Sequence, residues 1–345
     1  MQDDSQPPHP RSSAHYDDAG ALADQPPADS QALVDRPLAD HPRSTAAQDT
    51  GLNRDPTPYG RGVAMQTPTT DIGRAALAAL LDDPAHALLA TDFDGVLAPI
   101  VDDPDTAHVH PGAVAALSRV AARVRGVAVV TGRPAAQAVS LGGFEGADGL
   151  ADLVVLGQYG VERWEASTGE VTAPEPPPGI EPARRRVPGL LAELGLSDAQ
   201  VEDKGRALAL HVRRLPDPDD ALERLRQPVA ELAAENDLHV EPGKHVFELR
   251  AVGFDKGDAI RTLLEETSAT TLVYIGDDVG DIPAYDAVEA HRDGDAQRHG
   301  LLIWSESDES PAAAQALGQR ADLVVPGPDG VIAWLEQLAD RLDAQ

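Results

Sequence analysis

Two carboxylates, Asp92 and Asp94, stand just after the apolar run of residues 88–90 and directly before Gly95. A buried parallel strand reads as such an apolar run, and open α/β sheets place their ligands beyond the carboxyl ends of these strands. A calcium loop is excluded, because its glycine stands at the sixth position, whereas Gly95 is the fourth residue counted from Asp92. We therefore expect Asp92 and Asp94 to lie at the mouth of a crevice, with a chance surface loop as the alternative.

A second group of carboxylates follows the apolar run of residues 271–275, where Gly276 precedes Asp277, Asp278 and Asp281. Acids delivered by two strand ends make an oxygen-rich site, which is the kind of site that Mg²⁺ prefers. Without a cation, so many clustered acids would repel one another. The sequence therefore predicts a magnesium site, with an acidic surface loop as the alternative.

A hydroxyl residue, Thr131, ends the apolar run of residues 127–130, and a new helix is expected near Ala135. A hydroxyl and free backbone N–H groups at a strand-to-helix junction suit a phosphate oxygen. Threonine at this position also suits the N-cap of the next helix. The sequence leaves both interpretations open, and both can hold.

Lysine is rare in this chain: of its 28 Lys and Arg residues only Lys204, Lys244 and Lys256 are lysines. A position that keeps lysine is one where a compact ammonium charge is favoured over a planar guanidinium. Lys256 also stands near the start of a helix expected to run through Leu264, where the helix dipole favours an anion. Composition therefore nominates these three lysines for anion or hydroxyl contacts, against the alternative of solvated surface lysines.

The formal net charge of −30 argues against nucleic acid as a partner, because phosphate backbones are bound by clusters of Lys and Arg. No apolar run reaches the roughly 18 residues of a membrane span, and the first residues show no signal-peptide pattern. Cysteine is absent, which excludes disulfides and thiol chemistry. We expect a cytoplasmic monomer that acts on a small molecule, without a membrane partner.

The N-terminal residues 1–65 are rich in Pro, Asp, Gln, Ser and Ala and show no sustained apolar period. Such a segment buries too little apolar surface to offset the entropy lost on ordering. We expect a disordered extension, with a short helix over residues 28–35 as the alternative.

From residue 71 onward, apolar strands alternate with helices, a pattern typical of a parallel sheet. Residues 174–188 contain six prolines and three consecutive arginines, which indicates a linker or boundary. Beyond it a strand, a helix over residues 221–236 and a hairpin make a small α+β module. The predicted domains are a core of residues 71–180 and 251–345, interrupted by a cap of residues 181–250.

Together these stretches resemble the haloacid-dehalogenase-like phosphohydrolases, and most closely their trehalose-6-phosphate phosphatase branch. The narrower resemblance rests on residues 157–162, 202–205, 211–213 and 242–250, and it covers roughly residues 72–342. It implies an α/β fold with a Rossmann-like parallel-sheet hydrolase core and an inserted α+β cap domain. It also implies Mg²⁺-dependent hydrolysis of trehalose 6-phosphate, the last step of trehalose biosynthesis, through an aspartyl-phosphate intermediate.

The resemblance further implies a role for each matching residue. Asp92 would be the nucleophile and Asp94 the general acid and base, while Thr131 and Lys256 would hold the transferred phosphoryl oxygens. The metal would be held by Asp92, Asp94 (through its carbonyl), Asp277 and Asp278. The residues expected to bind the rest of the substrate are Gly132, Arg133, Glu162, Lys204, His211, Arg213, Lys244 and Glu248. For His211 and Arg213, an ordinary place on a strand face is the alternative.

The sequence departs from the branch at two places. Val96 stands where Thr or Ser is usual, and Gly280-Asp281-Ile282 stands where Thr-Asp-Glu is usual. Three other functions stay open: a phosphatase for sucrose-phosphate, mannosyl-phosphoglycerate or a hexose phosphate, a non-catalytic sugar-phosphate sensor, and an interaction module run by the N-terminal extension.

Overall fold

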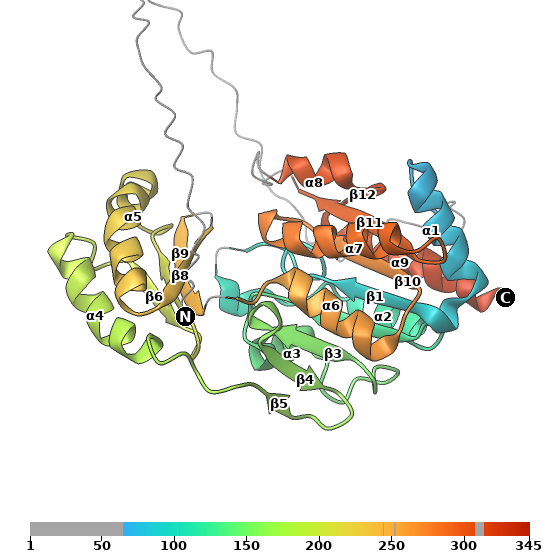
Figure 1. Cartoon of the computed structure of the whole chain (residues 1–345), viewed down its shortest axis with the longest axis horizontal. Helices are drawn as coiled ribbons and strands as arrows, with labels where there is room; N and C mark the ends of the chain where they lie inside the picture. Colours follow the sequence, from blue (N-terminus) through green and yellow to red (C-terminus); the bar gives the residue numbers. More distant parts are fainter. Residues whose placement is uncertain (1–64, 102, 244, 252, 308–313) are drawn as a thin grey trace, which may run out of the picture. The chain divides into compact units, whose positions relative to one another are not determined.

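The computed structural model describes residues 65–101, 103–243, 245–251, 253–307 and 314–345 (Figure 1). The predicted disordered extension therefore lies outside the described residues, apart from Met65, and so does the candidate site residue Lys244. None of the described helices combines the length and the apolar character that a membrane span requires.

Eight strands form a large sheet in the order β12-β11-β10-β1-β2-β3-β4-β5. They are β1 (Ala87–Thr91), β2 (Gly126–Val130), β3 (Val154–Gly157), β4 (Glu162–Glu165), β5 (Val171–Thr172), β10 (Thr271–Gly276), β11 (His299–Glu306) and β12 (Leu323–Pro326). The strands from β12 to β3 are parallel, whereas β4 and β5 are antiparallel additions at one edge. From β1 the chain adds β2 to β5 on one side of the sheet, and it later adds β10, β11 and β12 on the other side. The order thus reverses between β1 and β10, the kind of place where open α/β sheets bind ligands.

Helices cover both faces of the large sheet, because successive strand residues point to opposite faces. Leu89 packs into the apolar cluster of α1 (Asp71–Asp82), α2 (Ala113–Ala121), α3 (Ala135–Gly142) and α9 (Gly327–Asp343). Its neighbour Leu88 packs into the cluster of α6 (Lys256–Thr267), α7 (Ile282–Gly294) and α8 (Gln315–Arg320). Figure 1 shows α6 and α7, in orange, side by side on that second face. The predicted α/β fold with a mostly parallel sheet is confirmed.

Four antiparallel strands form a small sheet in the order β6-β7-β9-β8. They are β6 (Gln200–Asp203), β7 (Leu208–His211), β8 (Leu238–Gly243) and β9 (Val246–Ala251), and they pack on α4 (Ile180–Glu193) and α5 (Pro218–Glu235). Leu208 and Leu210 join that apolar cluster, so the alternate residues of β7, Ala209 and His211, belong to the opposite face. The division into a core and a cap at residues 181–250 stays a prediction.

The expected linker over residues 174–188 is in part a helix, because α4 already begins at Ile180. Pro182 falls in the first turn, where a backbone N–H has no helical partner to lose, and Pro188 lies inside the helix. The residues of α4 that are buried against the small sheet recur at helical spacing: Ile180, Ala183, Val187, Leu190 and Leu191. Burial of this apolar stripe outweighs the helix-breaking tendency of the prolines.

Candidate active site

The acids that follow β1 and β10 come together because these two strands are parallel neighbours in the sheet. Carboxylate oxygens of Asp92, Asp277, Asp278 and Asp281 all lie within 4.8 Å of one another. We call these four residues the acid cluster. Asp92 and Asp277 are buried and Asp281 is fully buried. The predicted meeting of carboxylates from two strand ends is therefore present in the structure.

Lys256 supplies a positive charge in the middle of these acids. Its ammonium Nζ lies 2.5 Å from Asp92 Oδ2 and 2.6 Å from Asp281 Oδ1, and the side chain is only 3% exposed. The residue is positioned by the start of α6, where Asp255 and Asp258 form a capping box. Burial alone would lower the pKa of Lys256, but the charges of Asp281 and Asp92 outweigh it and raise that pKa well above its ordinary value. Lys256 is therefore a permanent cation.

Asp281 positions its neighbours and has little capacity left for a metal. Its Oδ1 accepts hydrogen bonds from Lys256 and from the Tyr274 hydroxyl, each at 2.6 Å. Its Oδ2 accepts from the backbone N–H groups of Asp277 at 2.8 Å and Asp278 at 3.1 Å. Because a carboxylate offers about four lone-pair sites, these four bonds leave Asp281 saturated. The acids free to hold a cation are then Asp92, Asp277 and Asp278.

The chemistry of these three acids fits a hard divalent cation. Burial, together with repulsion from neighbouring carboxylates, raises the pKa of Asp277 well above its usual range. Burial and the charge of Asp281 raise the pKa of Asp278 in the same way. Buried anionic oxygens that repel one another are stabilised by a bound cation, and Mg²⁺ takes oxygen ligands of this kind. A cation would thus offset charge that Lys256 alone does not balance.

The side chain of Asp94 lies outside the acid cluster, bound by Arg133. Arg133 Nη2 and Nε donate to the two carboxylate oxygens of Asp94, each at 2.7 Å. The Arg133 guanidinium also lies over the Phe93 ring, 5.5 Å from its centroid, and donates to the carbonyl oxygen of Pro104 at 2.8 Å. The expected metal role of Asp94 can therefore fall only to its backbone carbonyl.

Thr131 is not an N-cap, so one of its two expected roles is wrong. Helix α3 begins at Ala135 with Pro134 as its N-cap and no side-chain cap from that residue. The Thr131 oxygen instead accepts a hydrogen bond from the backbone N–H of Arg133 at 3.1 Å. Within the described part of the chain, the Thr131 hydroxyl donates no hydrogen bond of its own. It therefore has a donor available at the end of β2.

The start of α3 is held by Glu162, which was expected to bind substrate. Glu162 Oε2 accepts from the backbone N–H of Ala135 at 2.7 Å, and its Oε1 accepts from the Gln158 amide at 2.6 Å. Glu162 lines neither of the two cavities at the acid cluster. The structure thus places Glu162 in support of the strand-to-helix junction and apart from the other candidate residues.

Two adjoining cavities open beside the acid cluster. The inner cavity, of about 280 Å³, is lined by Asp92, Asp94, Thr131, Gly132, Arg133, Lys204 and Lys256, among others. The outer cavity, of about 510 Å³, is lined by Asp277, Asp278, Glu241, His245 and Glu248, among others. Residues that line both are Ile100, Pro104, Tyr159, His211, Arg213, Val246, Asp278 and Gly280. Most of the predicted catalytic and binding residues therefore line these two cavities, which share part of their walls.

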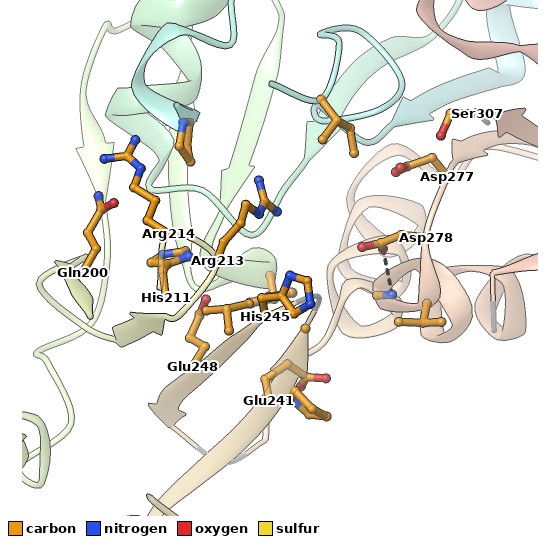
Figure 2. A pocket seen from close by; sticks show the side chains of 18 residues that line it. Gln200, His211, Arg213, Arg214, Glu241, His245, Glu248, Asp277, Asp278 and Ser307 are labelled. Carbon is orange, nitrogen blue, oxygen red and sulfur yellow. Dashed lines mark hydrogen bonds between the residues drawn. The ribbon is translucent and has the colours of Figure 1, made fainter. Parts of the chain in front are cut away.

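The small sheet contributes the wall opposite the acids. Figure 2 shows His211, Arg213 and Glu248 of this wall across the outer cavity from Asp277 and Asp278. Lys204 Nζ lies 2.6 Å from Glu248 Oε2, whereas the buried Glu248 Oε1 has no hydrogen-bond partner among the described residues. A buried carboxylate oxygen of this kind is an acceptor ready for a ligand hydroxyl. The cavity-facing position of His211 and Arg213 favours binding over the alternative of ordinary strand residues.

Glu202 was absent from the expected binding residues, although it lines the inner cavity. Its Oε2 lies 3.0 Å from His211 Nε2, and this hydrogen bond is the main reason why the pKa of Glu202 is lowered. A signal in the sequence could have found it, because Glu202 belongs to the stretch of residues 202–205 on which the family resemblance rests.

Comparison with known structures defines the class by its fold. The C-terminal domain of trehalose-6-phosphate phosphatase from Candida albicans aligns with a TM-score of 0.61 at 19% identity, covering 80% of this chain and 99% of that chain. The C-terminal domain of the trehalose synthase regulatory protein from Candida albicans aligns with a TM-score of 0.59 at 12% identity, covering 79% and 99%. At these identities the likeness shows a common fold and no more.

Comparison at the sequence level is more specific. The model of the trehalose-phosphatase family matches residues 90–316. The trehalose-phosphate phosphatase of Mycobacterium avium (strain 104) is 32% identical over 266 residues, which is 75% of this chain. The chain belongs to the trehalose-phosphatase family, and the expected resemblance is confirmed. The alignment spans 63% of the length of the Mycobacterium avium protein.

Proposed function

We propose that this protein is a Mg²⁺-dependent phosphatase that hydrolyses trehalose 6-phosphate to trehalose and inorganic phosphate. The observation that carries the proposal is the buried contact of Lys256 with Asp92, beside Asp277 and Asp278, at the edge of a cavity with a polar far wall. Membership of the trehalose-phosphatase family and the name of the Mycobacterium avium relative support the choice of substrate.

In the proposed reaction a carboxylate oxygen of Asp92 attacks phosphorus, and the bond from phosphorus to the sugar oxygen breaks. Asp94 gives a proton to the departing sugar oxygen and later takes a proton from the water that hydrolyses the aspartyl-phosphate. Arg133 binds both oxygens of Asp94 in this structure, so proton transfer requires that this pair opens. Lys256 and the free donor of Thr131 hold the transferred phosphoryl oxygens.

Mg²⁺ held by Asp92, Asp277, Asp278 and the carbonyl of Asp94 would neutralise phosphoryl charge and let an anionic nucleophile approach an anionic ester. On the opposite wall, the sugar hydroxyls would bind Lys204, Glu248, His211 and Arg213, with Gly132 and Arg133 closer to the phosphoryl group. Lys244 belongs to this set as a prediction from the sequence. We also propose that the protein acts in the cytoplasm as a monomer, without nucleic-acid or membrane partners.

Two of the residues that depart from the family pattern, Val96 and Ile282, leave the proposed chemistry in place. Val96 is fully buried in the apolar cluster beneath the sheet and lines neither cavity. Ile282 packs against the apolar cluster on the other face. Both residues therefore serve packing, and the acids and Lys256 that the reaction needs are in contact without them.

The test is release of inorganic phosphate from trehalose 6-phosphate, sucrose 6-phosphate and glucose 6-phosphate, with Mg²⁺, with a chelator, and with an Asp92→Asn variant. We expect strong preference for the trehalose ester and loss of release with the chelator and with the variant. Preference for another ester would keep the mechanism and overturn the substrate. No release from any ester would overturn the enzyme and favour a non-catalytic sugar-phosphate sensor.

A further inference from the structure

The backbone between β3 and β4 is held in a conformation that side-chain-bearing residues rarely adopt. Gln158 has φ of 46° and Tyr159 has φ of 61°, and Gly160 follows with φ of 103°. For residues other than glycine the left-handed region is sterically unfavourable, because the Cβ atom lies too close to the backbone. Strain of this kind persists only where the surroundings enforce it, and it is concentrated at functional sites. We therefore expect the conformation of residues 158–160 to serve a function.

Three hydrogen bonds to two neighbouring loops enforce this conformation. The backbone N–H of Tyr159 donates to the carbonyl oxygen of Thr131 at 2.9 Å, and that of Gln158 donates to Arg133 at 2.8 Å. The Gln158 amide also donates to the carbonyl oxygen of Lys204 at 2.9 Å. The segment is thus tied to the loop after β2 and to the loop after β6, which both line the inner cavity.

The result of the strain is the placement of the Tyr159 side chain. A Cβ added to Gly132 would lie 3.0 Å from Tyr159 Cζ and from its hydroxyl oxygen, so the hydroxyl end of the ring lies directly on the loop after β2. The Arg250 guanidinium covers the ring face, 4.5 Å from its centroid, and Glu241 holds Arg250 at 2.6 Å. The ring is clamped, and rotation of the side chain is restricted.

The Tyr159 hydroxyl has no hydrogen-bond partner in the part of the chain that the structure describes. Tyr159 lines both the inner and the outer cavity, and among the described residues its hydroxyl donates no hydrogen bond. Burial raises the pKa of the Tyr159 phenol well above its usual value, so the group stays protonated. A neutral donor suits a hydroxyl or ether oxygen, whereas Lys256 already serves the anionic phosphoryl group.

We propose that Tyr159 is a specificity-determining residue whose hydroxyl donates a hydrogen bond to a sugar oxygen next to the phosphate ester. The inference rests on the proposed phosphatase function and deepens it. A hydrogen bond made to the alcohol part of the substrate favours sugar phosphates over esters whose alcohol has no such oxygen. The clamped ring lowers the entropy lost when the bond forms.

The experiment compares kcat/KM for trehalose 6-phosphate and for p-nitrophenyl phosphate, an aryl ester without sugar oxygens, in wild type and in Tyr159→Phe. Phenylalanine keeps the ring against Gly132 and under Arg250 and removes only the hydroxyl. We expect kcat/KM for the sugar ester to fall by about tenfold or more, with a change of at most about twofold for the aryl ester.

The matched control is Tyr285→Phe, because the Tyr285 hydroxyl is buried on the carbonyl oxygen of Ile303 at 2.9 Å and lines neither cavity. It should leave the ratio of the two kcat/KM values unchanged. Equal losses on both esters in Tyr159→Phe would mean that the hydroxyl only supports the loop after β2, and wild-type kcat/KM values for both esters would mean that it makes no sugar contact. Either result overturns the inference.

Failure of the proposed substrate can be told apart from failure of this inference. If wild type prefers another sugar ester, the same ratio is measured with that ester. If no ester is turned over, calorimetry compares trehalose 6-phosphate binding to Asp92→Asn and to Asp92→Asn/Tyr159→Phe. An affinity reduced about tenfold in the second variant supports the inference, and equal affinities or no binding overturn it.

Discussion

At the scale of single residues, Lys256 supplies the positive charge that stabilises the buried acid cluster. It is the one basic side chain among the described residues that contacts Asp92 and Asp281 together. Buried charges are costly unless they are paired, and removal of one partner leaves the others uncompensated. The same ammonium is the group proposed to bind the transferred phosphoryl oxygens, so stability and activity depend on one atom.

We predict that Lys256→Met lowers phosphate release by at least about 100-fold, because a preorganised charge at the phosphoryl group is lost. The same change should lower the free energy of unfolding by about 3–5 kcal/mol, since Asp92 and Asp281 lose their shared partner. Denaturant unfolding and a phosphate assay measure the two effects. In Lys256→Met/Asp281→Asn, stability should partly return while activity does not; recovery of activity would contradict the assigned role.

The raised pKa values of Asp277 and Asp278 predict how the stabilisation of the folded protein by Mg²⁺ depends on pH. A carboxyl whose pKa is raised by folding contributes stability at low pH and loses it as the pH rises through the folded value. The metal-free protein should therefore lose stability on account of these groups as the pH rises from the ordinary carboxyl pKa of about 4, so that it is less stable at about pH 7 than at about pH 5. Bound Mg²⁺ should offset that loss.

Thermal unfolding with and without Mg²⁺ tests this prediction. We expect a larger increase in Tm at about pH 7 than at about pH 5, because fewer protons compete with the cation. Asp277→Asn should remove the increase. The control Asp340→Asn, which changes an exposed acid paired with Arg119, should retain it. An equal increase at both pH values would show that these acids do not hold the metal.

At the scale of elements, the parallel pair of β1 and β10 brings together chemistry from positions far apart in the sequence. The turn after β1 must also leave room for the side chain from β10. Gly95 has φ of +70°, and a Cβ there would lie 2.0 Å from Asp277 Oδ2. Gly143, at the end of α3, has a similar φ of +62° but no heavy atom within 4 Å of an added Cβ. Substitutions at these two glycines therefore distinguish the effect of backbone strain from the effect of steric overlap with Asp277.

We predict that Gly95→Ala lowers phosphate release by about 100-fold, because displacement of Asp277 by about 1 Å disturbs the metal site. Gly143→Ala should cost only the backbone strain of about 1–2 kcal/mol and keep its activity. Phosphate assays at saturating Mg²⁺ and thermal unfolding make the comparison. Equal losses of activity in the two variants would show that backbone strain, and not contact with Asp277, is the cause.

At the scale of the whole molecule, the two sheets form opposite walls of the site. The large sheet carries the acids, and the small sheet faces them across the cavities. Lys204 and Glu248 form an ion pair in which the side chains are only 12% and 9% exposed. Nearby, Arg206 donates instead to the carbonyl oxygen of Pro174 and lines neither cavity. These two basic residues, two positions apart, offer a matched test of substrate recognition.

We predict that Lys204→Met lowers kcat/KM for trehalose 6-phosphate by about 10- to 100-fold, mainly through KM, because a contact with the sugar is lost. Hydrolysis of p-nitrophenyl phosphate should change little, and Arg206→Met should behave as wild type with both esters. Steady-state kinetics on the two esters provide the measurement. A parallel fall with the aryl ester would place Lys204 at the phosphoryl group rather than at the sugar.

Several features of the fold could be read from the residues alone. The apolar runs before Asp92, Thr131 and Asp277 are the strands β1, β2 and β10, because a strand buried on both faces has an uninterrupted apolar signature. The helix expected near Lys256 begins at that residue. By contrast, α4 was missed because its prolines and arginines hide an apolar stripe that only packing against the small sheet makes decisive.

By itself, the sequence determined the α/β class and the strand ends that carry the acids. These depend on local apolar patterns and on the rule that parallel strands end at one edge. Only the tertiary structure decided that Glu162 holds α3, that Arg133 binds Asp94 and that Tyr159 is clamped between Gly132 and Arg250. Each of these depends on contacts between residues that are distant in the chain. Such contacts are determined by how the helices and strands pack, and a local sequence pattern does not predict them.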